Sequence, residues 1–366
     1  MSSTQFSEPV NSQLPEQHLL VIRLSAMGDV ALMAPVLNAL LKSHPYVKVG
    51  LLSLEKWRPI FKNHPRLTFI AAQTKGKHKG LLGLWRLSKE LKALTPNAIV
   101  DLHQVLRSKI IRSFLPGSQY PTTLIDKGRQ EKRALTKIKN KVFKPLPHTT
   151  ERYAKAFAQL GFNIPLDHSA LLPKPSSSAA HIKTSYMRIG VAPFAAHAGK
   201  QYPLAKMEEA LRIFEKNTAE KLIKYQLVFF GGGPIEKPLI EQLCHDFPVS
   251  THALALSFEE ELTEIAHLDL MVAMDSGNAH LAAMYGVPTI TLWGNTHPYA
   301  GFSPFLQDPE NALLADREKY PLLPTSVFGK KVPKGYEHVM DSILPEKVAQ
   351  KMSDIIEKTS ASGQKN

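Results

Sequence analysis

A single carboxylate, Asp29, stands at the junction of two apolar runs in LLVIRLSAMGDVALMAPVLNALL, residues 19–41. The first run is short and continuous, as in a buried strand, whereas the second repeats at three and four residues, as in a helix. An aspartate at this point can cap the free N–H groups of the helix. It can also face a ligand cleft and act as a general base. Residue type alone leaves both interpretations open.

The stretch VAMDSGNAHLAAMYGVP, residues 272–288, gathers several functional residues at one predicted strand-to-helix turn. These residues are Asp275, Ser276, Gly277 and His280. The start of a helix offers unpaired N–H groups and the positive end of the dipole, and both favour a phosphate group. Each residue alone could be a cap or a surface side chain, but the combination predicts an anion site.

Two further loops follow predicted strands. APFAAHAGKQYPL, residues 192–204, carries Lys200, and a lysine in such a loop can neutralise a phosphate. FFGGGPIEK, residues 229–237, has three adjacent glycines, which allow a ligand to approach the backbone closely. A solvated lysine and a plain tight turn remain as alternatives.

Motifs for other chemistries are missing from the sequence. The loop at Gly28 lacks the other glycines of the G-x-G-x-x-G dinucleotide fingerprint. The sequence also has no H-E-x-x-H pair, and no D-x-D pair to hold a metal ion against a nucleotide diphosphate. We therefore expect no metal site and no cofactor, with any diphosphate neutralised by lysine, N–H groups and helix ends.

Alternating strands and helices must position these residues. The order predicted for the first half is strand 18–24, helix 29–45, strand 47–53, helix 55–63, strand 67–72, helix 81–94 and strand 98–103. The order predicted for the second half is strand 188–194, helix 203–218, strand 225–230, helix 234–247, helix 257–268, strand 269–275, helix 278–286 and strand 287–294. This rhythm predicts the α/β class with a doubly wound parallel sheet in each half, and a ligand cleft at the carboxyl ends of the strands.

Composition shifts divide the chain. Residues 171–187 crowd Pro and Ser together and lose both periods, which is typical of an interdomain connection. The final predicted helix, 344–359, could pack on either half. The expected organisation is a disordered tail at 1–17, a first domain at 18–172, a linker at 173–187, a second domain at 188–345, and a C-terminal helix and tail at 346–366.

The charge balance favours an anionic partner. The net charge is +13, and the excess is densest in residues 126–145. Nucleic acid, an anionic lipid and a phosphorylated substrate all fit such an excess, and a solvated basic loop and helix explains the dense stretch equally well. The sequence has no RNA-recognition or zinc-finger pattern, so we expect no nucleic-acid partner.

The remaining composition favours a cytoplasmic protein. One cysteine, Cys244, leaves no intramolecular disulfide possible, and its helical setting predicts a buried small residue rather than a nucleophile. No apolar run is long enough to span a bilayer. The first 17 residues lack the basic and apolar regions of a signal peptide.

Three stretches together resemble glycosyltransferase family 9, the ADP-heptose:lipopolysaccharide heptosyltransferases of Gram-negative bacteria. They are VIRLSAMGDVALMAPVLNAL, APFAAHAGKQYPL and MDSGNAHLAAMYGVPTITLWGNT, and the likeness covers most of residues 19–300 in the family's order and spacing. It implies a GT-B fold, two Rossmann-like domains with the active site in the interdomain cleft, and an inverting transfer without a metal ion. It also implies an ADP-sugar donor held by the second domain. The implied acceptor is an anionic lipid-linked saccharide of the lipopolysaccharide inner core, bound by the first domain. The positive charge of that domain would attract such an acceptor at the cytoplasmic face of the inner membrane, so we expect peripheral contact with that membrane.

The resemblance also implies roles for particular residues. Asp29 matches the base that deprotonates the acceptor hydroxyl, and Lys200 matches the contact to the diphosphate. The residues that match the turn holding the sugar nucleotide are Asp275, Ser276, Gly277 and His280. Leu256 matches an apolar residue against the adenine, and Glu236 an acidic residue near the ribose.

One loop departs from the family. Where the family often carries hydroxyl residues before the lysine, this chain has Ala195 and Ala196, and His197 is a candidate substitute. The basic stretch 126–145 falls where the acceptor is expected. Three alternatives remain open: a family relative with another nucleotide sugar or acceptor, a GT-B sugar-nucleotide epimerase, and a binding module without activity.

Overall fold

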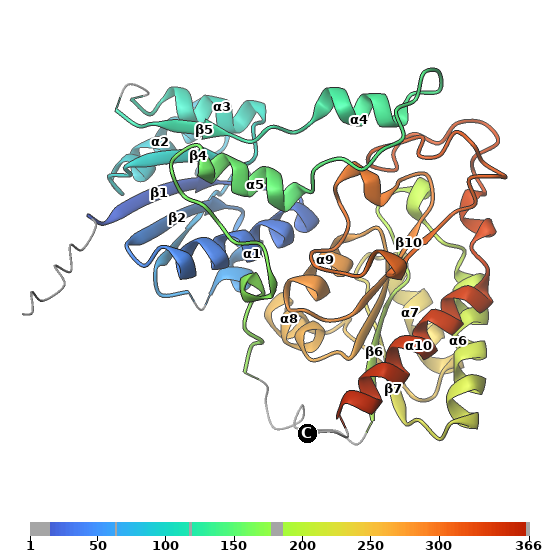
Figure 1. Ribbon diagram of the computed structural model, residues 1–366. Helices are drawn as coiled ribbons and strands as arrows, with labels where there is room; N and C mark the ends of the chain where they lie inside the picture. The colour runs from blue at the N-terminus through green and yellow to red at the C-terminus, as the bar shows by residue number, and fades with distance from the viewer. Residues whose placement is uncertain (1–14, 63, 117–118, 177–185, 364–366) are drawn as a thin grey trace, which may run out of the picture.

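Two lobes, each built on a parallel sheet, make up the molecule (Figure 1). The computed structural model describes residues 15–62, 64–116, 119–176 and 186–363. The first sheet has the order β3-β2-β1-β4-β5, formed by β1 (Gln17–Ile22), β2 (Val47–Ser53), β3 (Leu67–Ala71), β4 (Ala98–Asp101) and β5 (Thr122–Leu124). The second has the order β11-β10-β9-β6-β7-β8, formed by β6 (Met187–Ala192), β7 (Tyr225–Phe229), β8 (Ser250–His252), β9 (Leu270–Met274), β10 (Thr289–Trp293) and β11 (Ala312–Leu314). Both orders are doubly wound, as the alternating pattern predicts.

Helices cover both faces of the first sheet. Leu19 and Val21 of β1 belong to the core beneath α1 (Met27–Ser43) and α5 (Thr149–Ala158), whereas Leu20 and Ile22 belong to the core beneath α2 (Gly80–Lys92) and α3 (Leu106–Ser113). Successive residues of a strand point to opposite faces, so a strand covered on both sides is a continuous apolar run. This explains the unbroken LLVI of the sequence.

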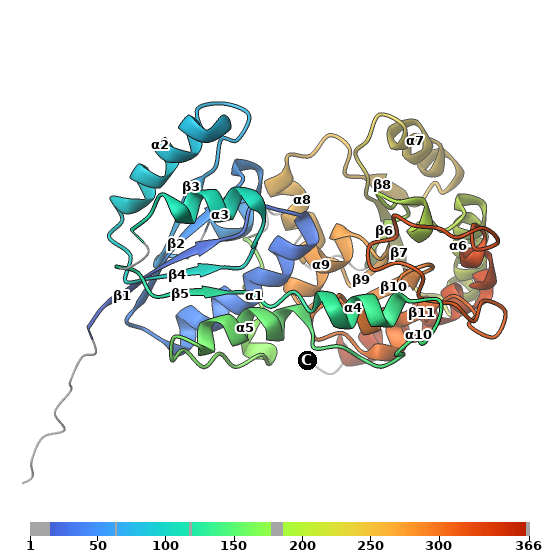
Figure 2. The ribbon, with the colours of Figure 1, turned by 90° about the horizontal axis from the view of Figure 1, so that it is seen from above.

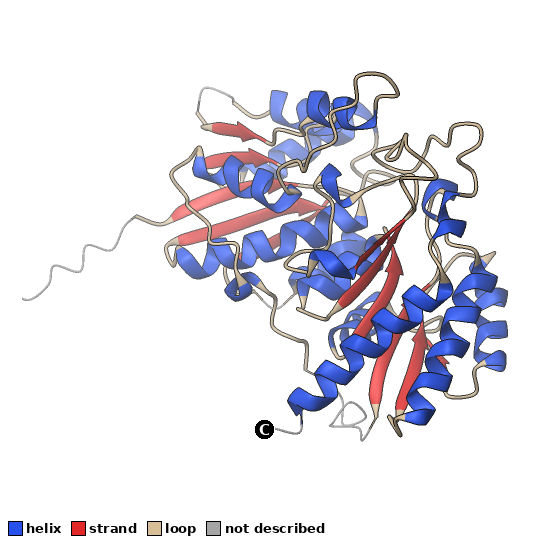
Figure 3. Ribbon diagram, turned by 45° about the vertical axis from the view of Figure 1, so that its right-hand side comes forward, coloured by secondary structure: helices blue, strands red, loops and turns tan. Residues whose placement is uncertain are grey.

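The second sheet is covered in the same way (Figure 3). Helices α6 (Leu204–Glu220), α7 (Glu236–Asp246) and α10 (Pro345–Gly363) contribute to the core on the outer face. Helices α8 (Phe258–Ala266) and α9 (Gly277–Met284) contribute to the core on the inner face, which also contains residues of α1. The final helix α10 therefore packs on the second lobe, against α6.

The lobes meet where α1 crosses α9, and two glycines permit the approach. A Cβ added at Gly28 would stand 2.6 Å from Cδ2 of His280. A Cβ added at Gly277 would clash with the Met27 side chain. One apolar core then runs from α1 through α9, so the inner faces of both lobes share buried side chains such as Leu37 and Leu281.

Some expectations differ from the observed elements. The helix expected at 55–63 is a 3₁₀ helix, Glu55–Phe61, which contains Pro59. Proline has no N–H to donate and 3₁₀ geometry suits short pieces. Strand β1 begins at Gln17, one residue inside the predicted tail, and residues 1–14 and 177–185 of the predicted tail and linker lie outside the described residues. The domain boundaries stay predictions.

Elements that the sequence reading did not assign also appear. They are α3, β5, α5, β8 and β11, whereas α4 (Arg129–Thr136) lies in the basic stretch 126–145, for which a loop and helix was one interpretation. Several are only three residues long and carry too little periodicity to detect. Cys244 is half-buried on α7 against the core of the second lobe, and burial raises the pKa of its thiol, which disfavours the nucleophilic thiolate.

Candidate active site

The topology brings the predicted residues to one place. In a doubly wound sheet, the crevice for a ligand lies at the carboxyl ends of the strands where the winding reverses. In the first sheet the reversal lies between β1 and β4, and Asp29 follows β1. In the second sheet it lies between β6 and β9, and Lys200 follows β6 while Asp275 follows β9.

A cleft of about 900 Å³ lies between these edges. Its lining includes nine of the ten residues that the sequence predicts for the site: Asp29, Ala195, Ala196, Lys200, Glu236, Asp275, Ser276, Gly277 and His280. The tenth, Leu256, is 38% exposed and is not part of the lining. The structure therefore does not bring Leu256 to the other predicted residues.

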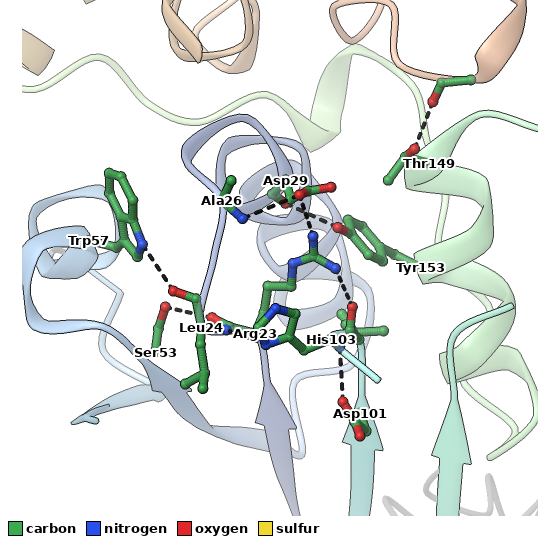
Figure 4. Close-up of polar contacts among 12 residues, drawn as sticks. Arg23, Leu24, Ala26, Asp29, Ser53, Trp57, Asp101, His103, Thr149 and Tyr153 are labelled. Atoms are coloured by element: carbon green, nitrogen blue, oxygen red, sulfur yellow. Dashed lines mark hydrogen bonds and ion pairs between the residues drawn. The ribbon is translucent and has the colours of Figure 1, made fainter. Parts of the chain in front are cut away.

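Asp29 faces the cleft from the first turn of α1 (Figure 4). Its Oδ2 lies 2.5 Å from Nη2 of Arg23 and accepts a hydrogen bond from the Ala26 N–H at 3.2 Å. The capping interpretation therefore holds for one oxygen, yet the side chain remains 27% exposed. Asp29 is both a helix cap and a carboxylate within reach of a ligand.

Arg23 is the partner that the sequence reading missed. Its side chain is 6% exposed, and Nη1 donates to the Leu102 carbonyl at 2.5 Å. Although burial acts to lower it, the pKa of Arg23 is raised by Tyr153 and Asp29. The Tyr153 hydroxyl donates to the backbone carbonyl of Asp29 at 3.2 Å, so α5 also supports this turn. A single arginine at the end of an apolar strand pattern resembles an ordinary surface residue. The spacing of the sequence therefore does not predict that Arg23 pairs with Asp29.

The opposite wall holds a second ion pair. Nζ of Lys200 lies 2.7 Å from Oδ2 of Asp275 and donates to the Asp275 carbonyl at 3.2 Å. Ser276 is the N-cap of α9, and its Oγ is buried without a hydrogen-bond partner among the described residues. A buried hydroxyl without a partner is costly, so a polar group of a ligand would stabilise it. The lysine, this hydroxyl and the start of α9 are groups that can bind an anion.

His280 lies at the crossing of the two helices, one turn into α9. Its ring is buried against Gly28, and Nδ1 has no hydrogen-bond partner within the described part of the chain. Burial lowers the pKa of His280 to about 4, against which Asp275 acts in the opposite direction. The ring is therefore neutral near pH 7 and can donate or accept one hydrogen bond, but it supplies no charge.

The two small-residue loops are held by side chains of their own lobe. Oε2 of Glu236 accepts hydrogen bonds from the N–H groups of Gly232 and Gly233 at 2.9 and 3.2 Å. The Ala195 N–H donates to Oε1 of Gln201 at 2.8 Å, so this backbone donor is already satisfied. Neither alanine offers a hydroxyl, and His197 lines the cleft beside them.

The basic stretch 126–145 bridges the lobes. After α4, Nζ of Lys141 donates to the Pro324 carbonyl at 2.7 Å, and the Phe143 ring lies 4.9 Å from that of Tyr299. Arg317 of the second lobe stands over Phe143, 3.5 Å from the ring centroid. The solvated interpretation holds for exposed members such as Lys139, whereas Lys141 and Phe143 contact the second lobe.

Comparison with known proteins bears directly on this cleft. The chain is 25% identical over 300 residues to a lipopolysaccharide heptosyltransferase 1 of Campylobacter coli, covering 77% of this chain and 85% of that protein. Its fold matches a family 9 glycosyltransferase structure from Veillonella parvula with a TM-score of 0.72 and 18% identity, covering 94% and 99% of the two chains. It also matches the Escherichia coli heptosyltransferase WaaC with ADP at a TM-score of 0.65 and 17% identity, covering 93% and 100%.

These likenesses confirm the predicted GT-B architecture. The model of glycosyltransferase family 9 (heptosyltransferase) matches residues 84–329, about two-thirds of the chain. That span begins in α2 and takes in the loop of Lys200 and the turn at Asp275. Because the match covers well over half of the sequence, this chain belongs to glycosyltransferase family 9 and is a glycosyltransferase of the heptosyltransferase type.

Proposed function

We propose that this enzyme transfers a heptose from ADP-heptose to an acceptor of the lipopolysaccharide inner core, with inversion at the anomeric carbon. The observation that carries the proposal is one cleft with a carboxylate on one wall and an anion site on the other. The names of its relatives supply the substrate class. In this proposal the first lobe binds the acceptor and the second lobe binds the donor.

Asp29 acts as the general base. The acceptor hydroxyl oxygen forms a bond to the anomeric carbon, its proton passes to the Asp29 carboxylate, and the bond from that carbon to the β-phosphate oxygen breaks. ADP leaves with the electron pair. Arg23 holds the carboxylate in place through its contacts to Asp29 and to the Leu102 carbonyl. Tyr153 fixes the same turn from α5.

The second lobe stabilises the leaving diphosphate with groups of this chain. Lys200 turns from Asp275 toward the β-phosphate, Ser276 donates its free hydroxyl, and the first N–H groups of α9 point at the same oxygens. Donors aimed at developing charge lower the barrier because they need no reorganisation during the reaction. Metal-independent transfer is part of this proposal. Within the described residues, no group of three or more His, Cys, Asp or Glu could hold a metal ion.

The basic first lobe fits a phosphorylated or carboxylated acceptor. Lys127 and Lys132 lie close enough to Asp29 for their charges to interact with it. Burial lowers the pKa of Lys132 to about 8, and the positive charge of Arg152 lowers it further. A lysine with such a pKa remains mostly charged at pH 7 and gains from an anionic ligand. We propose that catalysis takes place at the cytoplasmic face of the inner membrane, where a lipid-linked acceptor presents its saccharide to the cleft.

Replacing Asp29 tests the mechanism. Asp29→Asn keeps the size of the side chain but removes the base, so we expect kcat to fall by roughly 10²- to 10⁴-fold. The fall in rate at low pH, which reports protonation of the base, should vanish in the variant. Asp167→Asn is the control, because Asp167 caps a short helix on the surface and asparagine also caps. Full activity of Asp29→Asn with an unchanged pH profile would refute the role.

Product analysis tests the substrates. Purified enzyme is incubated with lipid extract and a panel of ADP-, UDP- and GDP-sugars, and mass spectrometry follows the lipid. We expect the mass of one heptose to be added with the ADP donor. A different donor would move the enzyme to another branch of the family. A changed nucleotide sugar without acceptor would indicate the epimerase alternative, and no product from any pair would indicate the binding module.

A further inference from the structure

Four large apolar side chains are exposed together on one side of the first lobe. Leu81, Leu82 and Trp85 of α2 are 66%, 60% and 39% exposed, and Leu106 at the start of α3 is 74% exposed. A hollow of about 450 Å³ lies between the two helices and is lined by Leu81 and Leu106 among others. We call this surface the α2–α3 face. Exposed apolar residues of the second lobe, such as Leu222, stand on other elements. Scattered single residues of that kind are ordinary, whereas a cluster marks an interaction surface.

The same face is rich in positive charge. Between residues 74 and 116 the sequence has nine Lys and Arg but two acidic residues. One of the two, Asp101, is buried and paired with Arg112, and the other, Glu90, is paired with Lys77 and His78. The exposed cations of this segment are Lys75, Lys77, Lys79, Arg86, Lys89, Lys92, Arg107 and Lys109. The face therefore combines apolar tips with an unbalanced positive rim.

Trp85 has the environment of an interfacial residue. Its side chain is 39% exposed, and Nζ of Lys89 lies 3.7 Å from its ring centroid. Tryptophan combines a large apolar ring with one polar N–H and concentrates where a membrane meets water. A lysine beside it can bury its methylene stem and keep its charge at the level of the headgroups.

The position of the face agrees with the position of the cleft. Helices α2 and α3 lie side by side and begin after the carboxyl ends of β3 and β4 (Figure 2). Asp29 follows the carboxyl end of β1 at the same edge of the sheet. The α2–α3 face thus lies at the same edge of the first lobe as Asp29 and the cleft.

We propose that the α2–α3 face docks the enzyme on an anionic lipid surface, with Leu81, Leu82, Trp85 and Leu106 entering the headgroup region. The charge excess selects an anionic partner, and the exposed leucines exclude one read by charge alone, such as nucleic acid. In the described part of the chain no helix is long and apolar enough to cross a membrane. The docking rests on the proposed function in one respect: a lipid-linked acceptor would require the enzyme to work at a lipid surface.

Vesicle flotation tests the docking with the full-length enzyme. We expect binding to phosphatidylcholine vesicles that contain about 30 mol % phosphatidylglycerol, weak binding to pure phosphatidylcholine, and release between about 0.1 and 0.5 M salt. Leu81→Ser/Leu82→Ser should lower the partition coefficient by about tenfold or more, because the buried methylene groups supply part of the affinity. The control is Leu222→Ser/Val249→Ser, which also replaces two exposed apolar side chains by serine, but on the second lobe, and should leave the partition coefficient unchanged.

Fluorescence identifies which face makes contact. Of the three tryptophans, Trp57 is 5% and Trp293 is 1% exposed, so Trp85 dominates any response to lipid. Emission should shift to shorter wavelength on anionic vesicles and be quenched by brominated phospholipid. Trp85→Phe should abolish both changes while leaving flotation nearly intact. Unchanged quenching in Trp85→Phe would overturn the assignment of the face.

Activity separates this inference from the proposed function. With a water-soluble acceptor that lacks acyl chains, Leu81→Ser/Leu82→Ser should match the wild type, and with acceptor embedded in vesicles it should lose rate. Failure of transfer with both acceptors in the wild type would contradict the proposed function and leave the flotation result standing. Equal flotation on neutral and anionic vesicles would overturn the docking. A wild-type dimer that the double variant converts to monomer would overturn it in favour of a second copy.

Discussion

At the level of single residues, the pairing of Asp29 with Arg23 shapes the site most strongly. A carboxylate held by an arginine has a fixed direction, and the arginine is itself anchored on the Leu102 carbonyl. The position of the proposed general base is thus set by the residues that directly follow β1 and β4. The sequence reveals the carboxylate because its junction is conspicuous. It hides the arginine because one charged residue inside an apolar strand has no distinguishing spacing.

Removing this arginine tests the anchoring. Arg23→Gln keeps a donor at the site but loses the charge and the second contact, so the carboxylate should move. We expect kcat to fall by roughly tenfold or more with the KM for the donor unchanged, and the free energy of unfolding to fall by about 1–3 kcal/mol. The control is Arg58→Gln, which breaks the exposed pair with Glu55 and should cost at most about 1 kcal/mol. An Arg23→Gln enzyme with normal kcat would show that Asp29 needs no anchor.

At the level of elements, much of the fold follows from periodicity and the rest follows from contacts. The runs at 18–24 and 269–275 predict their strands because both faces of each are buried. The sequence does not predict the strand β8 or the path of the stretch 126–145, because their structure depends on contacts with residues distant in sequence. Lys141 and Phe143, for instance, are ordered by residues near 299, 317 and 324. The family resemblance placed Leu256 in the site, but this residue is not among those that line the cleft.

The crossing of α1 and α9 gives a test at this scale. Gly28→Ala should lower the free energy of unfolding by about 1–3 kcal/mol, because the new methyl group would press on the His280 ring. Thermal or denaturant unfolding measures the change. In the His280→Ala background the ring is gone, so adding Gly28→Ala should lower the free energy of unfolding by less than it does in the wild type. Gly76→Ala is the control, since its nearest atoms lie 3.8 Å from the added Cβ. Additive effects of the two substitutions would refute the contact.

At the level of the whole molecule, buried neutral histidines make stability depend on pH. Burial lowers the pKa of His103, His280 and His297 to about 4 each. The unfolded chain binds protons at these sites below a pKa of about 6.5, while the folded chain does not until about pH 4. The unfolded state therefore gains protons first, and stability is lost as the pH falls from about 6.5 to about 4.

Unfolding experiments between pH 8 and pH 5 check this expectation. Below about pH 6.5, each such histidine makes the free energy of unfolding fall by up to about 1.4 kcal/mol per pH unit. His297 lies outside the cleft that holds Asp29, and His297→Gln keeps an acceptor for the Tyr299 N–H. We expect a flatter pH profile for His297→Gln than for wild type. The control is His252→Gln at an exposed position, and its profile should stay closer to that of the wild type than the profile of His297→Gln does. Equal slopes in all three proteins would show that His297 is protonated in the folded state.

The core that α1 shares with α9 has a consequence for engineering. In a glycosyltransferase built from two lobes, one lobe can be exchanged for that of a relative to change the sugar that is transferred or the acceptor that receives it. Here the exchanged half would carry away one side of a packed apolar seam, including the partner of each crossing glycine. Grafts that transplant only the substrate-contacting loops onto this backbone, and keep both seam helices, should fold where exchange of whole halves would yield insoluble protein.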